Sequence, residues 1–271
     1  MFDELIVAAA DTPLDLAAAG VASALARQLG VPWRLVSVVS APHEAELRDI
    51  ALAAALRDAD LEVPPIEVPA CTDAGGRLAV LARERPQALL CLATHARSLA
   101  GELMLGSVAD AVVRKVETPV LMVGPKLATD WPGRIETVLA CLDTSALAEA
   151  ALPAAVRLAR QSGAALRLVE VLPALPAHAN GAADPAGEAW YLRDAAAALR
   201  RDHGVEAEWD VLHSDDPGAA IAAHAATLPA AVVAMTTHGR SGLRQIVAGS
   251  VSHRVLRLAS GPVLLQRPRA A

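Results

Sequence analysis

The chain has 271 residues, a formal net charge of −6 and a hydrophobic fraction of 54%, with only 2% aromatic residues. This composition disfavours nucleic-acid binding, which uses basic surfaces and aromatic stacking platforms. No apolar run is long enough to span a bilayer, and the N-terminus carries Asp3 and Glu4 where a signal peptide carries basic residues. We therefore expect a cytoplasmic protein with no nucleic-acid or membrane partner.

In chain order, the first half alternates continuous apolar runs with amphipathic segments. Such runs are typical of strands buried on both faces of a parallel sheet. They predict strands at residues 5–10, 34–39, 66–70, 88–93 and 119–123. Helices are predicted at residues 14–28, 43–59, 76–83 and 107–116, with Gly30 ending the first. This alternation predicts a parallel α/β sheet with helices on both faces.

The second half repeats the pattern of the first. Short motifs return in the same order: Asp11-Thr12 as Asp143-Thr144, Arg-Gln-Leu-Gly at 27–30 as Arg-Gln-Ser-Gly at 160–163, and Gly106-Ser107-Val108 as Gly249-Ser250-Val251. A repeat of this length predicts a domain duplication. Breakers near residues 126–134 divide the chain into domains 1–127 and 128–271, and residues 173–188 read as a loop insertion in the second.

The three cysteines, Cys71, Cys91 and Cys141, stand singly in apolar, strand-like contexts. An odd number without CxxC spacing predicts buried, reduced thiols and neither a disulfide framework nor a metal site. Catalytic residues are not expected either. His95 and His238 have no carboxylate or nucleophile at a diagnostic spacing.

A glycine-containing segment follows the apolar run at residues 230–235. It carries Gly239, Gly242 and Gly249, and Gly249-Ser250 opens an amphipathic helix. A strand that leads through glycines to a helix N-terminus suits anion binding, because backbone N–H groups and the helix dipole favour negative charge. Neither the GxxxxGK[ST] nor the GxGxxG pattern is present.

This segment resembles the nucleotide loop of the universal stress protein family. The family pattern is Gly, two residues, Gly, nine residues, Gly and then Ser or Thr. Here Thr236 replaces the first glycine, and Gly239 and Gly249-Ser250 follow at the family spacing. The match extends through Val251-Ser252, and the likeness covers the whole chain as two tandem domains.

The resemblance implies a fold, a ligand and a general role. Each domain is expected to have a five-stranded parallel sheet of order 3-2-1-4-5 with helices on both faces. The expected ligand is ATP, with or without Mg²⁺, and the expected role is nucleotide binding in stress response without efficient catalysis. Two alternatives are a scaffold or signalling protein that binds no nucleotide and a slow ATPase.

The resemblance also assigns site residues, each with a structural alternative. The phosphate and ribose contacts fall on Gly239, Gly249, Ser250 and Ser252, with Thr236 and Val251 in the same segment; Asp143 matches the acidic residue near the adenosine or a magnesium ion, and Val171 the position whose backbone addresses the adenine. Apart from the resemblance, Arg240 could pair with phosphate oxygens because arginine offers a fork of donors. The glycine segment could instead be a turn with a helix cap. Asp143 or Thr144 could be a helix N-cap, Val171 could fill the core, and Arg240 could be a solvated charge.

The two halves are expected to differ in function. The first half has Ala93 and Ala96 in place of Thr236 and Gly239, and it adds the carboxylates Glu102 and Asp110. We therefore predict ATP binding in the second half only.

Each half ends in a hydrophobic strand that must be covered, at residues 119–123 and 262–265. We expect these strands to pair with each other within the chain around a pseudo-two-fold axis. A homodimer of the whole chain is left open.

Overall fold

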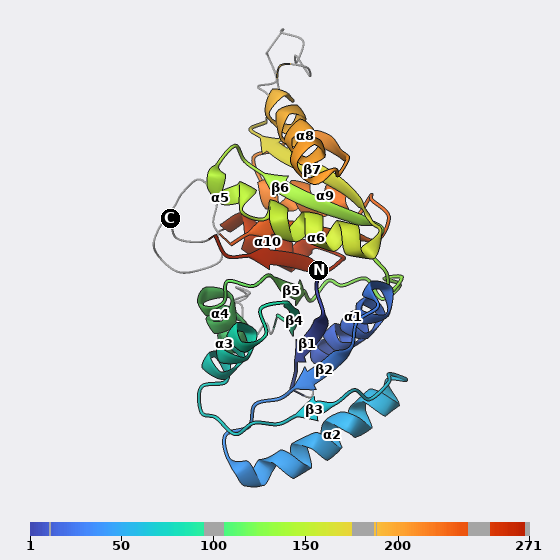
Figure 1. The fold of residues 1–271 in the computed structure, drawn as a ribbon, viewed down its shortest axis with the longest axis vertical. Coiled ribbons are helices and arrows are strands. Elements are labelled where there is room, and N and C mark those ends of the chain that lie inside the picture. The colour runs from blue at the N-terminus through green and yellow to red at the C-terminus, as the bar shows by residue number, and fades with distance from the viewer. Residues whose placement is uncertain (11, 95–105, 175–186, 188, 238–249, 269–271) are drawn as a thin grey trace.

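The computed structural model describes residues 1–10, 12–94, 106–174, 187, 189–237 and 250–268 (Figure 1). The first half contains β1 (Glu4–Ala8), α1 (Pro13–Leu29), β2 (Trp33–Val36), α2 (Ala45–Asp58), β3 (Ile66–Glu67), α3 (Ala74–Glu84), β4 (Ala88–Ala93), α4 (Ser107–Lys115) and β5 (Val120–Val123). The second half contains β6 (Thr137–Leu142), α5 (Ala146–Glu149), α6 (Leu152–Ser162), β7 (Ala165–Leu172), α8 (Trp190–His203), β8 (Ala207–His213), α9 (Pro217–Ala225), β9 (Ala231–Thr236), α10 (Ser250–Leu258) and β10 (Val263–Gln266).

One ten-stranded sheet runs through both halves in the order β3-β2-β1-β4-β5-β10-β9-β6-β7-β8. Within each half the strands are parallel and follow the order 3-2-1-4-5. The predicted fold class is therefore confirmed. Every residue of β4, β6 and β9 is buried, which explains their continuous apolar sequences.

Helices cover both faces of the sheet and form two hydrophobic cores. On one face α1, α2, α6 and α8 pack against alternate strand residues, such as Leu5 and Val138. On the other face α3, α4, α9 and α10 pack against the intervening residues, such as Ile6 and Leu139. Each core contains residues from both halves, so the duplicated domains share their interior.

The third strand is shorter than the sequence predicts. Residues 66–70 were expected to be extended, but β3 contains only Ile66 and Glu67, and Ala70 forms an isolated bridge with Val39. Pro69 lies between them. A proline has no backbone N–H to donate, so it interrupts the ladder at this point.

The two halves meet at an antiparallel pair of strands, β5 and β10, in the middle of the molecule (Figure 1). Leu264 pairs with Leu121, flanked by Val263 with Met122 and Leu265 with Val120. The predicted pairing of the final strands within one chain is therefore confirmed. We call this junction the seam.

Two glutamines reinforce the seam symmetrically. Gln28, near the end of α1, donates from Nε2 to the carbonyl of Ile135 (2.8 Å) and accepts at Oε1 from the N–H of Ile135 (2.8 Å). Gln161, near the end of α6, makes the same pair of bonds with the backbone of Phe2, each at 2.7 Å. The repeated Arg-Gln motif thus places a glutamine from each half on the backbone that leads into the other half's first strand.

We predict that Gln28→Ala and Gln161→Ala each destabilise the protein by about 1–3 kcal/mol. Ile135 and Phe2 are each only 2% exposed, so the backbone groups that lose a partner are poorly placed to bind water instead. Urea unfolding of the full chain measures the effect.

Arg27→Ala is the matched control, because Arg27 is the exposed neighbour of Gln28 on the same helix. It should change stability by less than about 0.5 kcal/mol. A loss for Arg27→Ala equal to that for Gln28→Ala would contradict a specific role for the glutamines.

Candidate functional site

The order of strands in the second half reverses between β6 and β9. Open α/β sheets bind ligands at such a point, outside the carboxyl ends of the strands. Leu142 pairs with Glu170, and the next residues along the two strands are Asp143 and Val171. Thr236 ends β9 on the other side of β6. The structure therefore brings Asp143, Val171 and Thr236 to one edge of the sheet.

The remaining predicted contacts lie on or before α10. Gly239, Arg240 and Gly249 are outside the described residues, and Ser250 is placed as the first residue of α10. Val251 is half-buried against the second core. The described part of the site therefore begins at the first turn of α10, whose backbone N–H groups have no partner within the helix.

Two of the predicted hydroxyl contacts are buried. Thr236 is 6% exposed and Ser252 is 2% exposed. Both residues are therefore largely withdrawn from the protein surface.

Asp143 organises the turn after β6. Its Oδ1 accepts hydrogen bonds from the N–H of Ser145 (3.1 Å) and from the hydroxyl of Ser145 (2.5 Å). The Ser145 hydroxyl oxygen in turn accepts from the N–H of Ala148 (3.1 Å) and caps α5. The prediction that Asp143 or Thr144 caps this helix is wrong. Thr144 adopts a left-handed φ of 67°, so the chain turns there and the helix begins one residue later.

A cluster of carboxylates that the sequence analysis missed lies beside Asp143. The Tyr191 hydroxyl on α8 donates to Oε1 of Glu149 on α5 (2.9 Å). Burial, and then the negative charges of Glu149, Glu170 and Asp143, raise the pKa of the Tyr191 phenol above its usual value. Glu170 is only 4% exposed, and its position as the single acidic residue within the apolar β7 sequence was the available signal.

The site is thus electrostatically divided. The ends of β6 and β7 near α5 and α8 carry carboxylates, whereas the start of α10 presents the positive end of a helix dipole. An anionic group is therefore favoured at α10 and disfavoured near Tyr191.

Close packing fixes α10 against α9. A Cβ at Gly218 would lie 2.4 Å from the Cβ of Arg254 and 3.1 Å from the carbonyl oxygen of Val251. Asp216 caps α9 by accepting from the N–H of Ala219 (3.0 Å), and it also accepts from Nε of Arg254 (3.1 Å). These contacts set the position of the first turn of α10.

The first half repeats this device. A Cβ at Gly75 would lie 2.5 Å from the Cβ of Ala111 on α4. Asp73 accepts from the N–H of Gly76 (2.8 Å) and from Nζ of Lys115 (3.1 Å). In each half, the helix that begins at the switch point is therefore held in place by a close contact with a glycine and by an aspartate that bonds both this helix and the helix it packs against.

A cavity of about 270 Å³ lies at the switch point of the first half. It is lined by the carboxyl ends of β1, β2 and β4 and by the start of α4, including Ala9, Ser37, Ala93 and Ser107. This volume falls below the range of about 300–1,000 Å³ that is usual for ligand sites. Ala93, which stands in place of Thr236, is one of the lining residues, whereas Ala96 and Glu102 are outside the described residues.

Two of the three cysteines are buried as predicted. Burial raises the pKa of the Cys91 and Cys141 thiols to about 12. Cys71 is half-buried, which differs from the prediction, because it follows the short bridge at Ala70. Within the described residues, three or more His, Cys, Asp or Glu side chains do not gather as metal ligands would.

The sequence model of the universal stress protein family matches residues 1–124 and 134–267. The chain therefore belongs to the universal stress protein family and carries two family domains in tandem. No curated protein sequence matches it. Among the described helices, none has the length and apolar character needed to cross a membrane.

Two solved structures that match nearly the whole chain support the tandem fold. A universal stress protein from Archaeoglobus fulgidus DSM 4304 is similar with 16% identity and a TM-score of 0.67, over 97% of this chain and 98% of that one. A putative universal stress protein from Pseudomonas aeruginosa UCBPP-PA14 has 20% identity and a TM-score of 0.60, over 98% and 94% of the two chains. A shorter A. fulgidus universal stress protein, solved in complex with dAMP, has 26% identity and a TM-score of 0.37, over 49% and 97%.

His253 makes the stability of the α10 region depend on pH. Its Nε2 is buried without a hydrogen-bond partner in the described part of the chain. Burial lowers the pKa of His253, although Asp110 opposes this shift in part. Because the unfolded chain then binds the proton more readily, stability is lost as the pH falls below the unfolded pKa of about 6.5.

We predict that His253→Gln reduces this loss of stability between about pH 7.5 and about pH 5.5. Urea unfolding at the two pH values measures it. His43→Gln is the control, since His43 is exposed. If both variants keep the full pH dependence of the parent protein, His253 is not its source.

Proposed function

We propose that the second half binds ATP at its switch point and that the protein is a nucleotide-binding stress-response protein. The observation that carries the proposal is the position of α10. It begins at Ser250, beyond the carboxyl end of β9, and the sequence that leads into it has the family's glycine spacing at Gly239 and Gly249. An anion cradle at a switch point is the setting in which α/β folds hold phosphates.

The charges favour one orientation of the ligand. The triphosphate lies at the first turn of α10, where the helix dipole attracts it. The adenosine lies toward Asp143 and the backbone of Val171, on the side where carboxylates surround Tyr191. Arg240 is proposed to pair with the phosphates, and Mg²⁺, when bound with ATP, would neutralise part of their charge.

The proposal does not include efficient catalysis. A general base needs a free acceptor within hydrogen-bond reach of the attacking water. Asp143 accepts two hydrogen bonds from Ser145, and Glu149 accepts one from Tyr191. Asp143 and Glu149 thus already take part in structural hydrogen bonds. The cytoplasmic location remains a prediction.

The first half is proposed not to bind ATP. Its cavity of about 270 Å³ is small for a nucleoside triphosphate. Asp110 adds a carboxylate in the first turns of α4, where it pairs with Arg114 at 2.6 Å. The start of this helix is therefore less favourable for phosphates than the start of α10.

Calorimetry on the full chain should give one ATP per chain. Gly249→Val should abolish binding, because a β-branched residue disfavours positive φ and close approach of the backbone to a phosphate. The matched control is Gly106→Val, the same change at the equivalent position of the first half, which should leave the affinity unchanged.

Other results separate the alternatives. Two sites of similar affinity would overturn the asymmetry. The absence of ATP binding, and of nucleotide in denatured purified protein, would favour the scaffold. Phosphate release well above that of Gly249→Val would indicate an ATPase.

Gly218→Ala tests the role of α10 packing. The added Cβ would clash with Arg254 at 2.4 Å and push α10 away from α9, so we expect ATP affinity to fall about tenfold or more, which corresponds to about 1.4 kcal/mol. Titration calorimetry measures the affinity, and the melting temperature reports stability.

Gly75→Ala is the matched control because it creates a similar clash, with Ala111 at 2.5 Å, in the first half. It should lower stability to a similar extent while leaving ATP affinity unchanged. Equal losses of affinity in both variants would show that the effect is a general one on folding.

A further inference from the structure

The two ends of the seam differ, although the fold is pseudo-symmetric. At the end where β10 begins, the segment between the halves packs against it, and the N–H of Ala128 donates to the carbonyl of Ser260 (2.8 Å). At the end where β5 begins, there is a groove of about 880 Å³. The groove is lined by both halves, including Gln87 before β4 and Arg157 on α6. We call it the seam groove.

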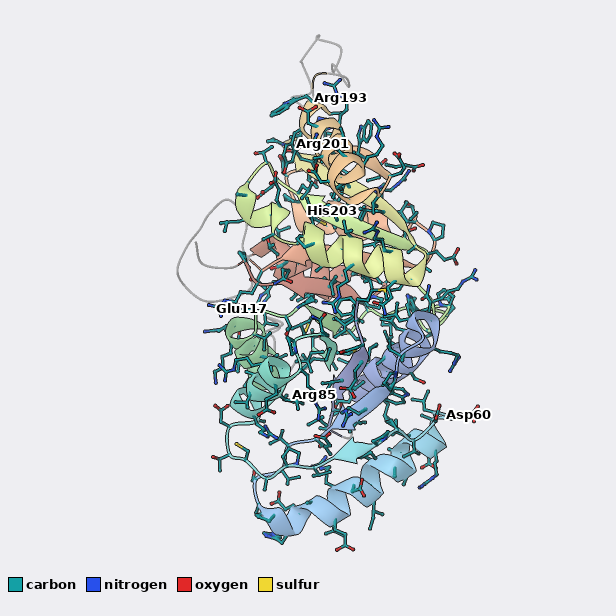
Figure 2. All side chains as sticks on the ribbon, in the orientation of Figure 1. Asp60, Arg85, Glu117, Arg193, Arg201 and His203 are labelled. Carbon is teal, nitrogen blue, oxygen red and sulfur yellow. The ribbon has the colours of Figure 1, made fainter. Side chains whose placement is uncertain are left out.

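Basic side chains surround the seam groove. Its lining contains Arg83, Lys115, Arg157 and Arg267, and Glu117 is the only carboxylate among the described residues of that lining. Figure 2 shows Glu117 near the level of the seam. Since the whole chain has a net charge of −6, this gathering of cations departs from the average character of the protein.

An open depression of about 620 Å³ adjoins the groove and extends the basic surface. Arg83, Lys115 and Arg267 line both hollows, and the depression adds Arg77, Arg114 and the carboxylate Asp73, which pairs with Lys115 at 3.1 Å. The three shared side chains therefore stand where the two hollows meet.

Helix ends explain only part of this charge. Arg83 and Lys115 lie in the last turns of α3 and α4, where cations complement the helix dipole. Arg157 and Arg267 come from the other half, and of these two only Arg267 contacts a helix end. Arg267 donates from Nη1 to the carbonyl of Arg114, which holds the end of β10 against the end of α4.

Two buried polar atoms in the lining have no hydrogen-bond partner in the described structure. They are Oγ1 of Thr118 and Nε of Arg157. Arg157 is otherwise well held, since Nη2 donates to Oε1 of Gln87 (2.7 Å) and its guanidinium lies 3.8 Å from the centre of the Phe2 ring. Both atoms are sealed from solvent, so the ligand contacts are left to the exposed groups of the lining.

Besides the charged residues and the polar Gln87, Thr118 and Gln266, the lining is apolar. Pro86, Pro119 and Pro153 line the groove together with small side chains. The apolar part of the lining suits the less polar part of a ligand. The arginines and the lysine suit its phosphate groups, which arginine recognises with two parallel hydrogen bonds.

We infer that the seam groove binds a small organic phosphate. Its clustered phosphate groups lie among Arg83, Lys115 and Arg267, and its less polar body lies over the prolines. The volume of the groove is within the usual range for small-molecule sites. The lining of the groove contains none of the predicted ATP-site residues that the structure describes. The groove lies opposite the switch point of the first half, but its Gln266 pairs with Thr236 at the end of β9, so it is on the same edge of the sheet as the switch point of the second half.

The test uses inorganic tripolyphosphate as the probe, with the full chain carrying Gly249→Val. That background removes the proposed ATP site, so the result does not depend on whether the second half binds ATP. Titration calorimetry should show one tripolyphosphate per chain, with affinity that weakens as salt is added.

Arg83→Ala/Lys115→Ala/Arg267→Ala should weaken tripolyphosphate binding about tenfold or more. The matched control is Arg193→Ala/Arg200→Ala/Arg201→Ala, which makes the same change in charge on α8. Figure 2 labels Arg193 and Arg201 at the far end of the molecule from the seam. This control should change the affinity less than about twofold if only long-range, screened charge is lost.

Failure of tripolyphosphate to bind, or an equal loss in the α8 control, would overturn the inference. Circular dichroism and the melting temperature establish that the variants are folded. If the triple variant does not fold, the double variant Arg83→Gln/Arg267→Gln replaces it and should still weaken tripolyphosphate binding severalfold. Unchanged binding in the double variant would also overturn the inference.

Discussion

A parallel half-sheet that ends in a hydrophobic edge strand must cover that edge, and here β5 and β10 cover each other. The antiparallel pairing centred on Leu121 and Leu264 joins the two five-stranded halves into one sheet. Because both faces of this sheet are covered by helices, the pairing also merges the interiors of the halves into two common cores. The duplicated domains are therefore best regarded as one folding body.

The seam explains features that have no meaning within a single half. Gln28 and Gln161 satisfy backbone groups of the opposite half at Ile135 and Phe2. Such bonds are costly to lose, since a buried backbone group without a partner carries most of its desolvation penalty. The seam groove is likewise a product of the junction, because neither half contains all of its lining.

Duplication has preserved packing more strictly than it has preserved local capping or ligand chemistry. Gly75 and Gly218 make equivalent close contacts beneath α4 and α10, and Asp73 and Asp216 cap equivalent helices. The turn after the first strand has diverged, since Thr12 forms a capping box with Asp15 in one half and Ser145 caps α5 in the other. The shape of the sheet and its helices constrains both halves, whereas the proposed ATP site would constrain only one.

The sequence alone determined most of the architecture, because strand burial and helix periodicity are local patterns. It predicted the strand order by resemblance, the intrachain pairing of the final strands and the ends of helices such as that at Gly30, which adopts a left-handed φ of 68°. It also identified the candidate site through Asp143, Val171 and the glycine segment. For Asp143 it left the ligand and capping roles open, and the cap proved to be Ser145.

Only the tertiary structure decided which distant residues act together. The carboxylates around Tyr191 come from three separate elements, and the cations of the seam groove come from both halves. The function of the repeated glutamine was also hidden, since its partners lie 107 and 159 positions away in the chain. Local sequence reports the propensity of a segment and the face it buries, but these sites depend on contacts that exist only after the two halves have joined.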